Sequence, residues 1–244
     1  MAQLPQSAAE PSGMYNRGFF DDQMAGSYRS AQVIVDILLK ILRVQSVVDI
    51  GCGVGTWLRA FEERGVTDLA GYDGEYVDRG QLLIEPARFH PADLALPVDF
   101  DRRFDLAVCL EVGEHLPLTA SDTLVGSLVR AAPAVLFSAA IPGQGGTHHV
   151  NEQWPSFWRA RFRANGYHAF DLIRPQVAYN LAIDSWYRHN TMLYLAKDHP
   201  AAARLRPNRW PSLKLHGRHI LLVNYIPLRK LVRGLFSRRI EAKL

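Results

Sequence analysis

Cysteine and long apolar runs are scarce in this sequence. Only two of its 244 residues are cysteine, Cys52 and Cys109, and neither lies in a CxxC or a Cys/His spacing. This excludes a disulfide framework as the basis of the fold and indicates a reducing compartment. Residues 1–13 lack the basic start and apolar stretch of a secretory signal, and no later apolar run approaches membrane-spanning length. We therefore expect a soluble cytoplasmic protein.

The length fits one α/β domain with additional segments. At 244 residues the chain can bury a sizeable core but is short for two full domains. From residue 201 onward eleven Lys or Arg face the single acid Glu241, a net charge of +10, whereas the whole chain carries +4. The preceding 200 residues therefore carry about −6, so the basicity belongs to the tail. We expect a partly disordered N-terminal segment (1–29) that could cover an active site, a domain (30–200) and a basic tail (201–244).

Apolar strands alternate with amphipathic helices along the expected domain. The spacing of apolar residues predicts helices at 30–42, 57–64, 118–131 and 154–165, and strands at 47–50, 69–72, 87–90, 104–110, 135–140, 168–173 and 192–196. A βαβ rhythm of this kind is typical of a parallel sheet with helices packed against it. The sequence therefore indicates the α/β class.

The segment at 47–58, VVDIGCGVGTWL, carries the strongest functional signal. An apolar strand runs into three alternating glycines and then into a helical pattern, so the chain turns sharply and leaves backbone open to a ligand. The following helix would present unpaired N–H groups there, as in nucleotide-type cofactor sites. A dinucleotide fingerprint needs a further glycine at the position of Thr56, so that cofactor class does not fit.

The run VDIGCGVGT resembles the first motif of the class I S-adenosylmethionine-dependent methyltransferases. The resemblance covers about residues 30–196 and implies a Rossmann-like, seven-stranded, mostly parallel sheet with helices on both faces. With it we expect an N-terminal helical segment and a basic C-terminal helical tail. The implied cofactor is S-adenosylmethionine. The residues expected to bind it are Asp49, Gly51, Gly53, Asp73, Asp93, Leu94 and Leu110.

Two of these aspartates have specific expected roles and specific alternatives. Asp73 ends the second strand between Gly71 and Gly74, where a carboxylate can accept both ribose hydroxyls. Its alternative role is that of a helix N-cap or turn aspartate. The resemblance implies that Asp93 accepts from the adenine amino group beside a backbone donor of Leu94. The alternative for Asp93 is a turn aspartate that follows Pro91.

Acidic and imidazole side chains follow the fourth and fifth expected strands. If the chain coils after the fourth strand, Glu111, Glu114 and His115 lie on one face at i, i+3 and i+4. The pattern is similar to the metal-binding segment of the small-RNA terminal 2′-O-methyltransferases and the ubiquinone-pathway O-methyltransferases. His149, or else His148, could complete such a site from the segment after the fifth strand. Two carboxylates and imidazoles suit Mg²⁺, Mn²⁺ or Fe²⁺, so the expected ligands are Glu111, Glu114, His115 and His149.

The same residues also have an interpretation without a metal. A Glu-His-Leu segment occurs widely in methyltransferases that use none, where the glutamate caps a helix and the histidine packs locally. In that case His149 is the leading general base, because imidazole titrates close to neutral pH. We expect His149 and Glu114 to be the catalytic residues with either mechanism.

The acceptor is expected to be a small hydroxylated molecule. Residues 149–158 resemble a block of bacterial methyltransferase-domain proteins associated with glycan or natural-product genes. Trp154 and Trp158 lie one helical turn apart and would line one wall of a pocket for a sugar or planar metabolite, or else belong to the core. Residues 183–190 would add to that pocket.

The tail and the cluster leave several partners and functions open. Residues 227–244 form a basic amphipathic pattern that suits an anionic membrane surface, the domain itself or the second subunit of a homodimer. Nucleic acid is less favoured, because the body is acidic. Our main hypothesis is an O-methyltransferase acting on a sugar, glycan or natural-product intermediate. The alternatives are an RNA 2′-O-methyltransferase and a non-catalytic, S-adenosylmethionine-binding membrane adaptor.

Overall fold

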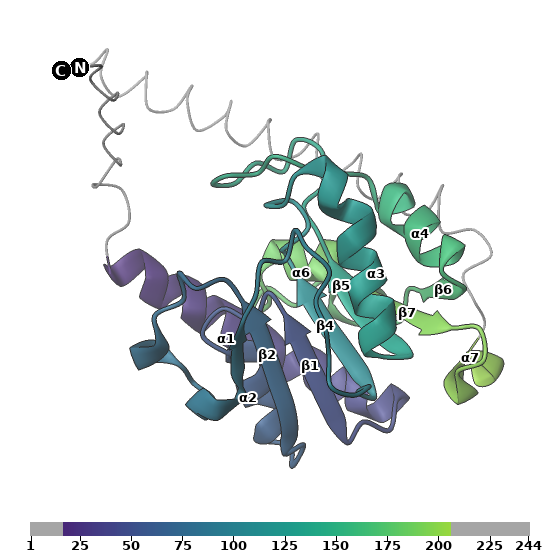
Figure 1. The fold of residues 1–244 in the computed structure, drawn as a ribbon, viewed down its shortest axis with the longest axis horizontal. Helices are drawn as coiled ribbons and strands as arrows, with labels where there is room; N and C mark the ends of the chain where they lie inside the picture. Colours follow the sequence, from purple (N-terminus) through teal and green to yellow (C-terminus); the bar gives the residue numbers. More distant parts are fainter. Residues whose placement is uncertain (1–16, 206–244) are drawn as a thin grey trace, which may run out of the picture.

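A seven-stranded sheet with the order β3-β2-β1-β4-β5-β7-β6 runs through the centre of the protein (Figure 1). The computed structural model describes residues 17–205 of the backbone. The first five strands pair in parallel, and β7 runs antiparallel to both β5 and β6. The strands are β1 (Ser46–Ile50), β2 (Asp68–Asp73), β3 (Phe89–Pro91), β4 (Leu106–Leu110), β5 (Ala134–Ser138), β6 (Tyr167–Phe170) and β7 (Met192–Ala196). The expected Rossmann-like, mostly parallel sheet is confirmed.

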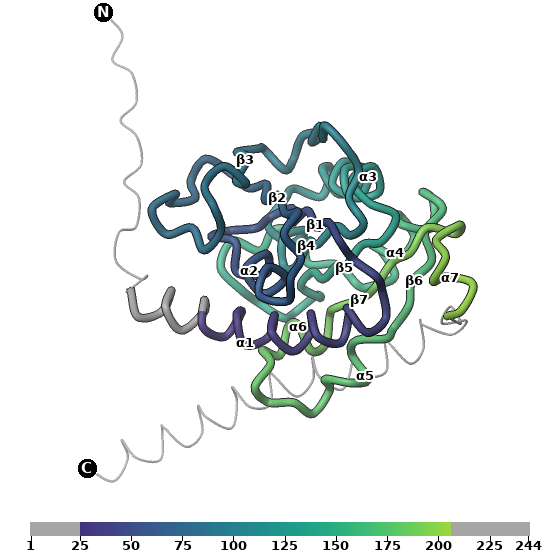
Figure 2. The backbone as a smooth tube through the Cα atoms, turned by 90° about the horizontal axis from the view of Figure 1, so that it is seen from below, coloured from purple at the N-terminus to yellow at the C-terminus, as the bar shows by residue number. Residues whose placement is uncertain are grey.

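Helices cover both faces of the sheet. The α-helices are α1 (Arg17–Ile41), α2 (Thr56–Glu62), α3 (Ser121–Ala131), α4 (Pro155–Ala164), α5 (Arg174–Val177), α6 (Ser185–Asn190) and α7 (Pro200–Arg204), and the short 3₁₀ helices are η1 (Arg79–Gln81), η2 (Pro86–Arg88) and η3 (Leu118–Ala120). Figure 2 shows α1 on one side of the sheet and α3 on the other. Apolar side chains of α1 and α2 form one core with the sheet, and those of α3 and α4 form the second. The two cores explain why the central strands are mostly apolar.

Strand β4 shows how the two cores divide one apolar strand. Leu106, Val108 and Leu110 belong to the core beneath α1 and α2, whereas Ala107 and Cys109 belong to the core beneath α3 and α4. Successive side chains of a strand point to opposite faces, so a strand covered on both faces needs apolar residues at every position. All five residues of β4 are buried.

Several element boundaries differ from the sequence expectation. Helix α1 begins at Arg17 rather than at residue 30, so the expected covering segment runs into the same helix as the domain. Strands β5 and β6 end earlier than expected, and α5 and α7 were not anticipated. Residues 1–16 and 206–244 lie outside the described residues, and so does the basic amphipathic pattern expected at 227–244.

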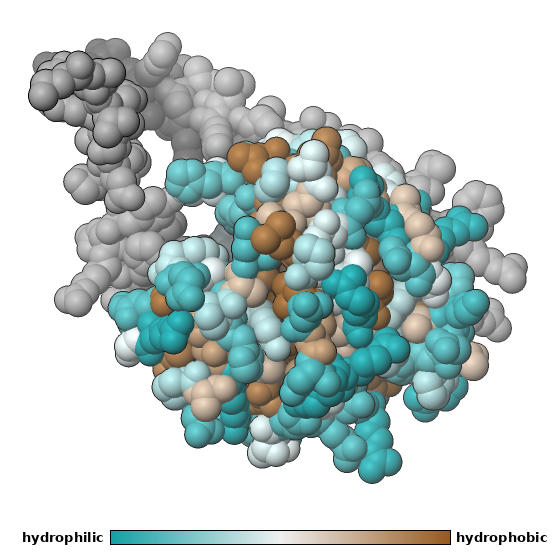
Figure 3. Space-filling model, viewed as in Figure 1, coloured by the Kyte–Doolittle hydropathy of each residue, from teal (hydrophilic) through white to brown (hydrophobic). Residues whose placement is uncertain are grey.

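The surface of the described part is mixed in character. In the view of Figure 3 hydrophilic residues cover most of the surface, and apolar residues lie between them in separate groups. Among the described residues no helix combines the length and the apolar composition that crossing a bilayer requires.

Candidate functional site

Three glycines form the turn between β1 and α2. At two of them a neighbouring side chain fills the space where a Cβ would stand, and at the third that space is open. Gly51, Gly53 and Gly55 have φ angles of 89°, 53° and 89°, a region that favours glycine. A Cβ on Gly51 would lie 2.2 Å from Cγ2 of Val112, and one on Gly55 would lie 2.9 Å from Cγ1 of Ile84. A Cβ on Gly53 would meet nothing within 4 Å. The chain therefore fills the space over the outer glycines and leaves Gly53 facing open space.

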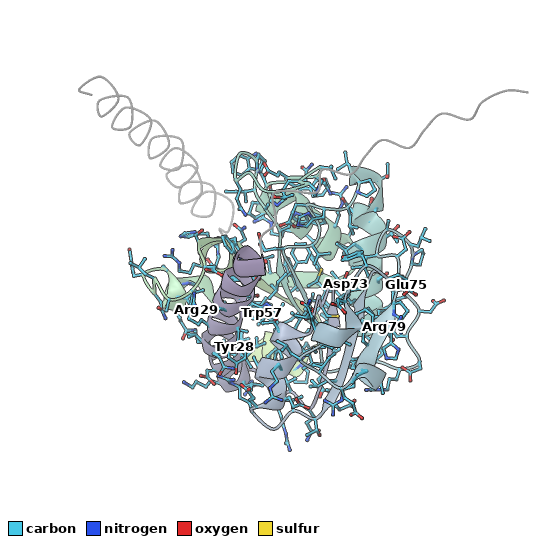
Figure 4. The ribbon with its side chains drawn as sticks, turned by 90° about the vertical axis from the view of Figure 1, so that its left-hand side faces the viewer. Tyr28, Arg29, Trp57, Asp73, Glu75 and Arg79 are labelled. Carbon is cyan, nitrogen blue, oxygen red and sulfur yellow. The ribbon has the colours of Figure 1, made fainter. Side chains whose placement is uncertain are left out.

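Asp73 joins the end of β2 to this turn. Its carboxylate is 4% exposed, and Oδ2 accepts the backbone N–H of Gly53 at 2.6 Å. Oδ1 accepts the backbone N–H of Gly74 at 2.7 Å and the hydroxyl of Tyr76 at 2.5 Å. In Figure 4 Asp73 lies inward of Glu75 and Arg79, which extend toward the molecular edge. The structure thus places the expected ribose-binding carboxylate against the expected cofactor turn, and the same carboxylate also stabilises the turn at Gly74.

Asp49 places a second carboxyl group under the turn. It is 2% exposed, and its Oδ2 has no hydrogen-bond donor among the described residues. Burial, and then the charge of Asp73, raise the pKa of Asp49 well above its usual range. A buried carboxyl oxygen without a donor favours a ligand that brings one, such as an ammonium group. Asp49 was expected either to orient the glycine turn or to bind the amino group of the cofactor's methionine part, and both roles stay predictions.

The other residues expected to bind the cofactor, Asp93, Leu94 and Leu110, have turn or core contacts in the structure. Asp93 is exposed, and its Oδ1 accepts the backbone N–H of Ala95 at 2.9 Å, which is the turn role named as its alternative. Leu94 is 7% exposed and packs into the core beneath α3. Leu110 is 7% exposed at the end of β4 and packs into the core beneath α1. No adenine contact follows from the hydrogen bonds of Asp93.

The segment after β4 is a turn and not the expected coil of helix. Glu111 has a φ of 56°, and its backbone N–H donates to the backbone oxygen of Ser138 at 3.0 Å. Its carboxylate accepts the side-chain amides of Gln144 at 3.2 Å and Asn190 at 3.3 Å. Burial raises the pKa of Glu111. Glu111 is therefore bound by two amides from other elements instead of standing on a helix face with Glu114 and His115.

Glu114, His115 and His149 nevertheless meet at one place. One ligand atom of each lies within 4.8 Å of the others. Glu114 is fully buried, and neither carboxyl oxygen has a donor among the described residues. Burial, and then the charge of Glu111, raise the pKa of Glu114. The rings of His115 and His149 lie 4.9 Å apart edge to face, and burial, and then His149, lower the pKa of His115. We name these three residues the Glu-His-His cluster.

The loop after β5 holds His149 in position. Nδ1 of His149 lies 3.0 Å from Oε1 of Glu152, which leaves Nε2 for another partner. Glu152 also accepts the backbone N–H groups of Gly143 at 2.7 Å and Gly145 at 2.8 Å. A carboxylate that fixes one ring nitrogen also fixes the orientation of the imidazole. His148, the alternative ligand, is exposed and is not part of the cluster.

Asn151 ties the same loop to the turn after β4. Its side-chain amide donates to the backbone oxygen of Gly113 at 3.1 Å and to Oγ of Ser121 at 3.0 Å. Its backbone N–H, like that of Val150, donates to the backbone oxygen of Glu114. These bonds hold His149 beside Glu114 although the two residues lie far apart in the sequence.

The two tryptophans expected to line one wall of a pocket have different surroundings. Trp158 is 2% exposed and packs in the core beside Phe137, with its ring against Gly113, so its core alternative is the right one. Trp154 precedes α4 and is half-buried. Helix α6 lies within the segment expected to add to the pocket, and its Tyr187 is buried. The ring centroids of Tyr187 and Trp57 lie 5.1 Å apart in an edge-to-face arrangement.

Sequence reasoning missed several residues that organise the site. Glu152 stands three positions after His149, which was the one available signal, and its orienting role was not anticipated. Gln144 and Asn190 gave no signal, because their contact with Glu111 depends on how three separate elements meet. The hydroxyl of Tyr187 pairs with Oγ of Ser27 on α1 at 2.9 Å, again between distant parts of the chain.

The residues of the glycine turn suit a cofactor, and those of the Glu-His-His cluster suit a divalent cation. The open position over Gly53 and the carboxylates of Asp49 and Asp73 fit a cofactor with a ribose and an ammonium group. For a divalent cation, the Glu-His-His cluster offers a buried carboxylate without donors and two imidazoles. One carboxylate and two imidazoles suit Fe²⁺ or Mn²⁺ better than Mg²⁺, which prefers oxygen ligands. The cluster therefore fits a cation, with Glu111 outside it.

Comparisons with known proteins agree with this architecture. The model of the family described as a methyltransferase domain matches residues 20–233. The ubiquinone biosynthesis O-methyltransferase of Stutzerimonas stutzeri (strain A1501) is 31% identical over 107 residues, which are 38% of this chain and 44% of that protein. That of Azotobacter vinelandii (strain DJ) is 31% identical over 107 residues, again 38% and 44%. The chain thus matches less than half the length of these relatives.

Two solved structures share the fold. The sugar N-methyltransferase KedS8 from Streptoalloteichus sp ATCC 53650 has a TM-score of 0.51 and 14% identity, covering 80% of this chain and 98% of that one. The magnesium protoporphyrin IX methyltransferase from Synechocystis PCC 6803, solved with bound S-adenosylmethionine, has a TM-score of 0.50 and 15% identity, covering 76% and 86%. With the family match over residues 20–233, the chain belongs to the methyltransferase-domain family of class I S-adenosylmethionine-dependent methyltransferases.

Proposed function

We propose that this protein is an S-adenosylmethionine-dependent O-methyltransferase of a small hydroxylated acceptor, such as a sugar, glycan or natural-product intermediate. The observation that carries the proposal is the Glu-His-His cluster. It follows β4 and β5, and β4 pairs in parallel with β1, which leads into the glycine turn. Carboxyl ends of parallel neighbours share one edge of the sheet, so donor and acceptor sites lie side by side. The likeness to ubiquinone O-methyltransferases supports transfer to oxygen.

The chemistry requires a place for one proton. The acceptor oxygen forms a bond to the methyl carbon, the carbon–sulfur bond of the sulfonium breaks, and the hydroxyl proton must leave. His149 accepts this proton in the proposal, because Glu152 fixes its Nδ1 and leaves Nε2 to take the proton. Glu114 supplies a carboxyl group beside it for orienting the acceptor. If a divalent cation is held by Glu114, His115 and His149, then His149 is a ligand and not the base, and the cation would itself lower the pKa of the acceptor hydroxyl.

Transfer from labelled S-adenosylmethionine into an extract of small metabolites tests the function directly. We expect one or a few low-mass products, found by mass spectrometry, that carry the label on an oxygen. Label found only in RNA with a free 2′-hydroxyl terminus would instead favour the RNA alternative. Binding of S-adenosylmethionine without turnover on any acceptor would favour the non-catalytic adaptor.

Chelation tests the cation separately from the methyl transfer. If the cluster holds a metal, we expect EDTA to lower turnover by at least about tenfold, and Mn²⁺ or Mg²⁺ to restore it. The affinity for S-adenosylhomocysteine should stay unchanged, because the cofactor carboxylates lie outside the cluster. Unchanged turnover and melting temperature after chelation would remove the cation and leave His149 as the base.

We further propose that the basic tail brings this enzyme to the cytoplasmic surface of an anionic membrane. The net charge of +10 after residue 200 supports the contact. Co-sedimentation with vesicles containing phosphatidylserine should fall sharply when residues 227–244 are deleted. It should also fall in 0.5 M salt for the full chain, since charges farther apart than about 4 Å are screened at that ionic strength. Equal sedimentation of both chains would exclude the membrane role, and a dimer lost on deletion would assign the tail to a subunit contact.

A further inference from the structure

The hydroxyl of Tyr76 is hydrogen-bonded to the carboxylate of Asp73, to which the proposed function assigns the ribose of the cofactor. The residue is 84% exposed, yet its hydroxyl donates to Oδ1 of Asp73 at 2.5 Å, and Asp73 is only 4% exposed. An exposed tyrosine ordinarily leaves its hydroxyl to water. Here it donates instead to a charged acceptor, which makes a stronger bond than one to a neutral group.

The backbone after β2 brings the hydroxyl to this place. The N–H of Val77 donates to the backbone oxygen of Gly74 at 3.2 Å, so residues 74–77 form a turn that folds back toward Asp73. Val77 is buried and fixes the end of the turn. The ring of Tyr76 lies against Gly74, where a Cβ would be 2.2 Å from Cε1 of the ring. Gly74 therefore leaves the room that this ring position needs.

The bond from Tyr76 matters because the carboxylate of Asp73 can accept only a few hydrogen bonds. A carboxylate has about four lone-pair positions in all. Gly53 uses Oδ2, and Gly74 and Tyr76 both use Oδ1. A ribose with two hydroxyls needs two acceptor positions, so it cannot bind fully while the phenol stays in place. The two backbone donors belong to the turn itself, which leaves the tyrosine as the donor that can move.

We propose that Tyr76 is a latch on the ribose subsite, with its hydroxyl taking the place of a ribose hydroxyl on Asp73 until the cofactor displaces it. This inference rests on the proposed function, which assigns S-adenosylmethionine to the glycine turn. The ring is exposed, but desolvation of the hydroxyl beside the buried Asp73, and then its bond to that carboxylate, raise the pKa of the Tyr76 phenol, so the hydroxyl remains a donor at neutral pH. The latch is therefore opened by the cofactor and not by a change of pH in this range.

The expected size of the effect follows from the fraction of time that the subsite is open. Apparent affinity falls in proportion to the population of the binding-competent state, so a latch closed for about nine-tenths of the time weakens binding about tenfold. An exposed side chain rotates within nanoseconds, far faster than a ligand binds. The latch therefore lowers the apparent association rate and leaves the dissociation rate unchanged.

The test is calorimetry and stopped-flow binding of S-adenosylhomocysteine to the full chain and to Tyr76→Phe. The substitution removes only the hydroxyl, so we expect about three- to tenfold tighter binding, carried by faster association with unchanged dissociation. The matched control is Tyr179→Phe, which removes the same atom from a 93% exposed tyrosine between α5 and α6. The control should bind as the natural chain does.

The outcomes separate the latch from the proposed function. If the natural chain binds the cofactor normally, two results for Tyr76→Phe overturn the latch alone. Weaker binding would mean that the hydroxyl contacts the bound cofactor, and unchanged binding would mean that it stays in solvent. Tighter binding through slower dissociation also overturns it. Absence of binding by the natural chain overturns both the cofactor assignment and the latch.

Discussion

Replacing His149 by alanine should lower methyl transfer by about 10²- to 10⁴-fold, the usual contribution of a general base. The affinity for S-adenosylhomocysteine should stay within about threefold of that of the natural chain, because the proposed cofactor site is the glycine turn, whereas His149 lies in the loop after β5. The measurement is steady-state transfer from labelled S-adenosylmethionine, paired with calorimetry of the product. A loss in kcat without a loss in cofactor affinity places His149 in the chemical step.

The size of this effect follows from how strongly the loop fixes the imidazole. Glu152 binds Nδ1 of His149 at 3.0 Å and is itself held by two backbone N–H groups. A base held in one orientation does not have to be ordered during the reaction. The same residue contributes to the cation site in the alternative mechanism, so the loss is expected whether or not a metal takes part.

His148→Ala is the matched control for this prediction. His148 is exposed in the same loop and lies outside the Glu-His-His cluster. It should lose less than about threefold in transfer, within the range of ordinary surface changes. An equal loss in both variants would point to the loop as a whole, and full activity of His149→Ala would contradict the assignment of the base.

The cofactor turn could be predicted from the sequence because its information is local. A strand, three glycines and a helix follow each other within residues 47–58, and positive φ angles at Gly51, Gly53 and Gly55 bear out the need for glycine. The sequence alone could not show which of the three glycines faces open space and which lie against other side chains. Val112 and Ile84, which fill the space over Gly51 and Gly55, come from distant parts of the chain.

The acceptor side was less predictable because its contacts join separate elements. The sequence placed Glu114, His115 and His149 together through a resemblance, and the structure brings them within 4.8 Å. It also suggested Glu111 as a fourth ligand on a helix face. The positive φ of Glu111 and its amide partners Gln144 and Asn190 follow from the meeting of β4, β5 and α6, which no local pattern encodes.

The aromatic residues show a second limit of sequence reasoning. Trp154 and Trp158 have the spacing of one helical turn, which fits a pocket wall and a core equally well. Helix α4 turns Trp158 toward Phe137 in the core and leaves Trp154 half-buried at its start. Spacing predicts that two side chains share a side of a helix, but the packing of that helix on the sheet decides what the side meets.

Replacing Gly53 by arginine should weaken the binding of S-adenosylhomocysteine by more than about 100-fold, or at least 2.7 kcal/mol. A Cβ at this position meets nothing within 4 Å, so the added side chain starts in open space. The space that it fills is the opening left between the two filled glycine positions, beside the carboxylate of Asp73. Calorimetry measures the loss directly.

The matched control is Gly65→Arg, because Gly65 also has a positive φ, 84°, and open space at its Cβ. It follows α2 at the exposed end away from the turn. Both variants accept a similar backbone strain, of order 1–3 kcal/mol in the free energy of unfolding, which urea denaturation measures. Only Gly53→Arg should lose the cofactor. If both variants bind it equally well, the open space over Gly53 is not where the cofactor lies, and the donor site must be sought elsewhere along the edge of the sheet.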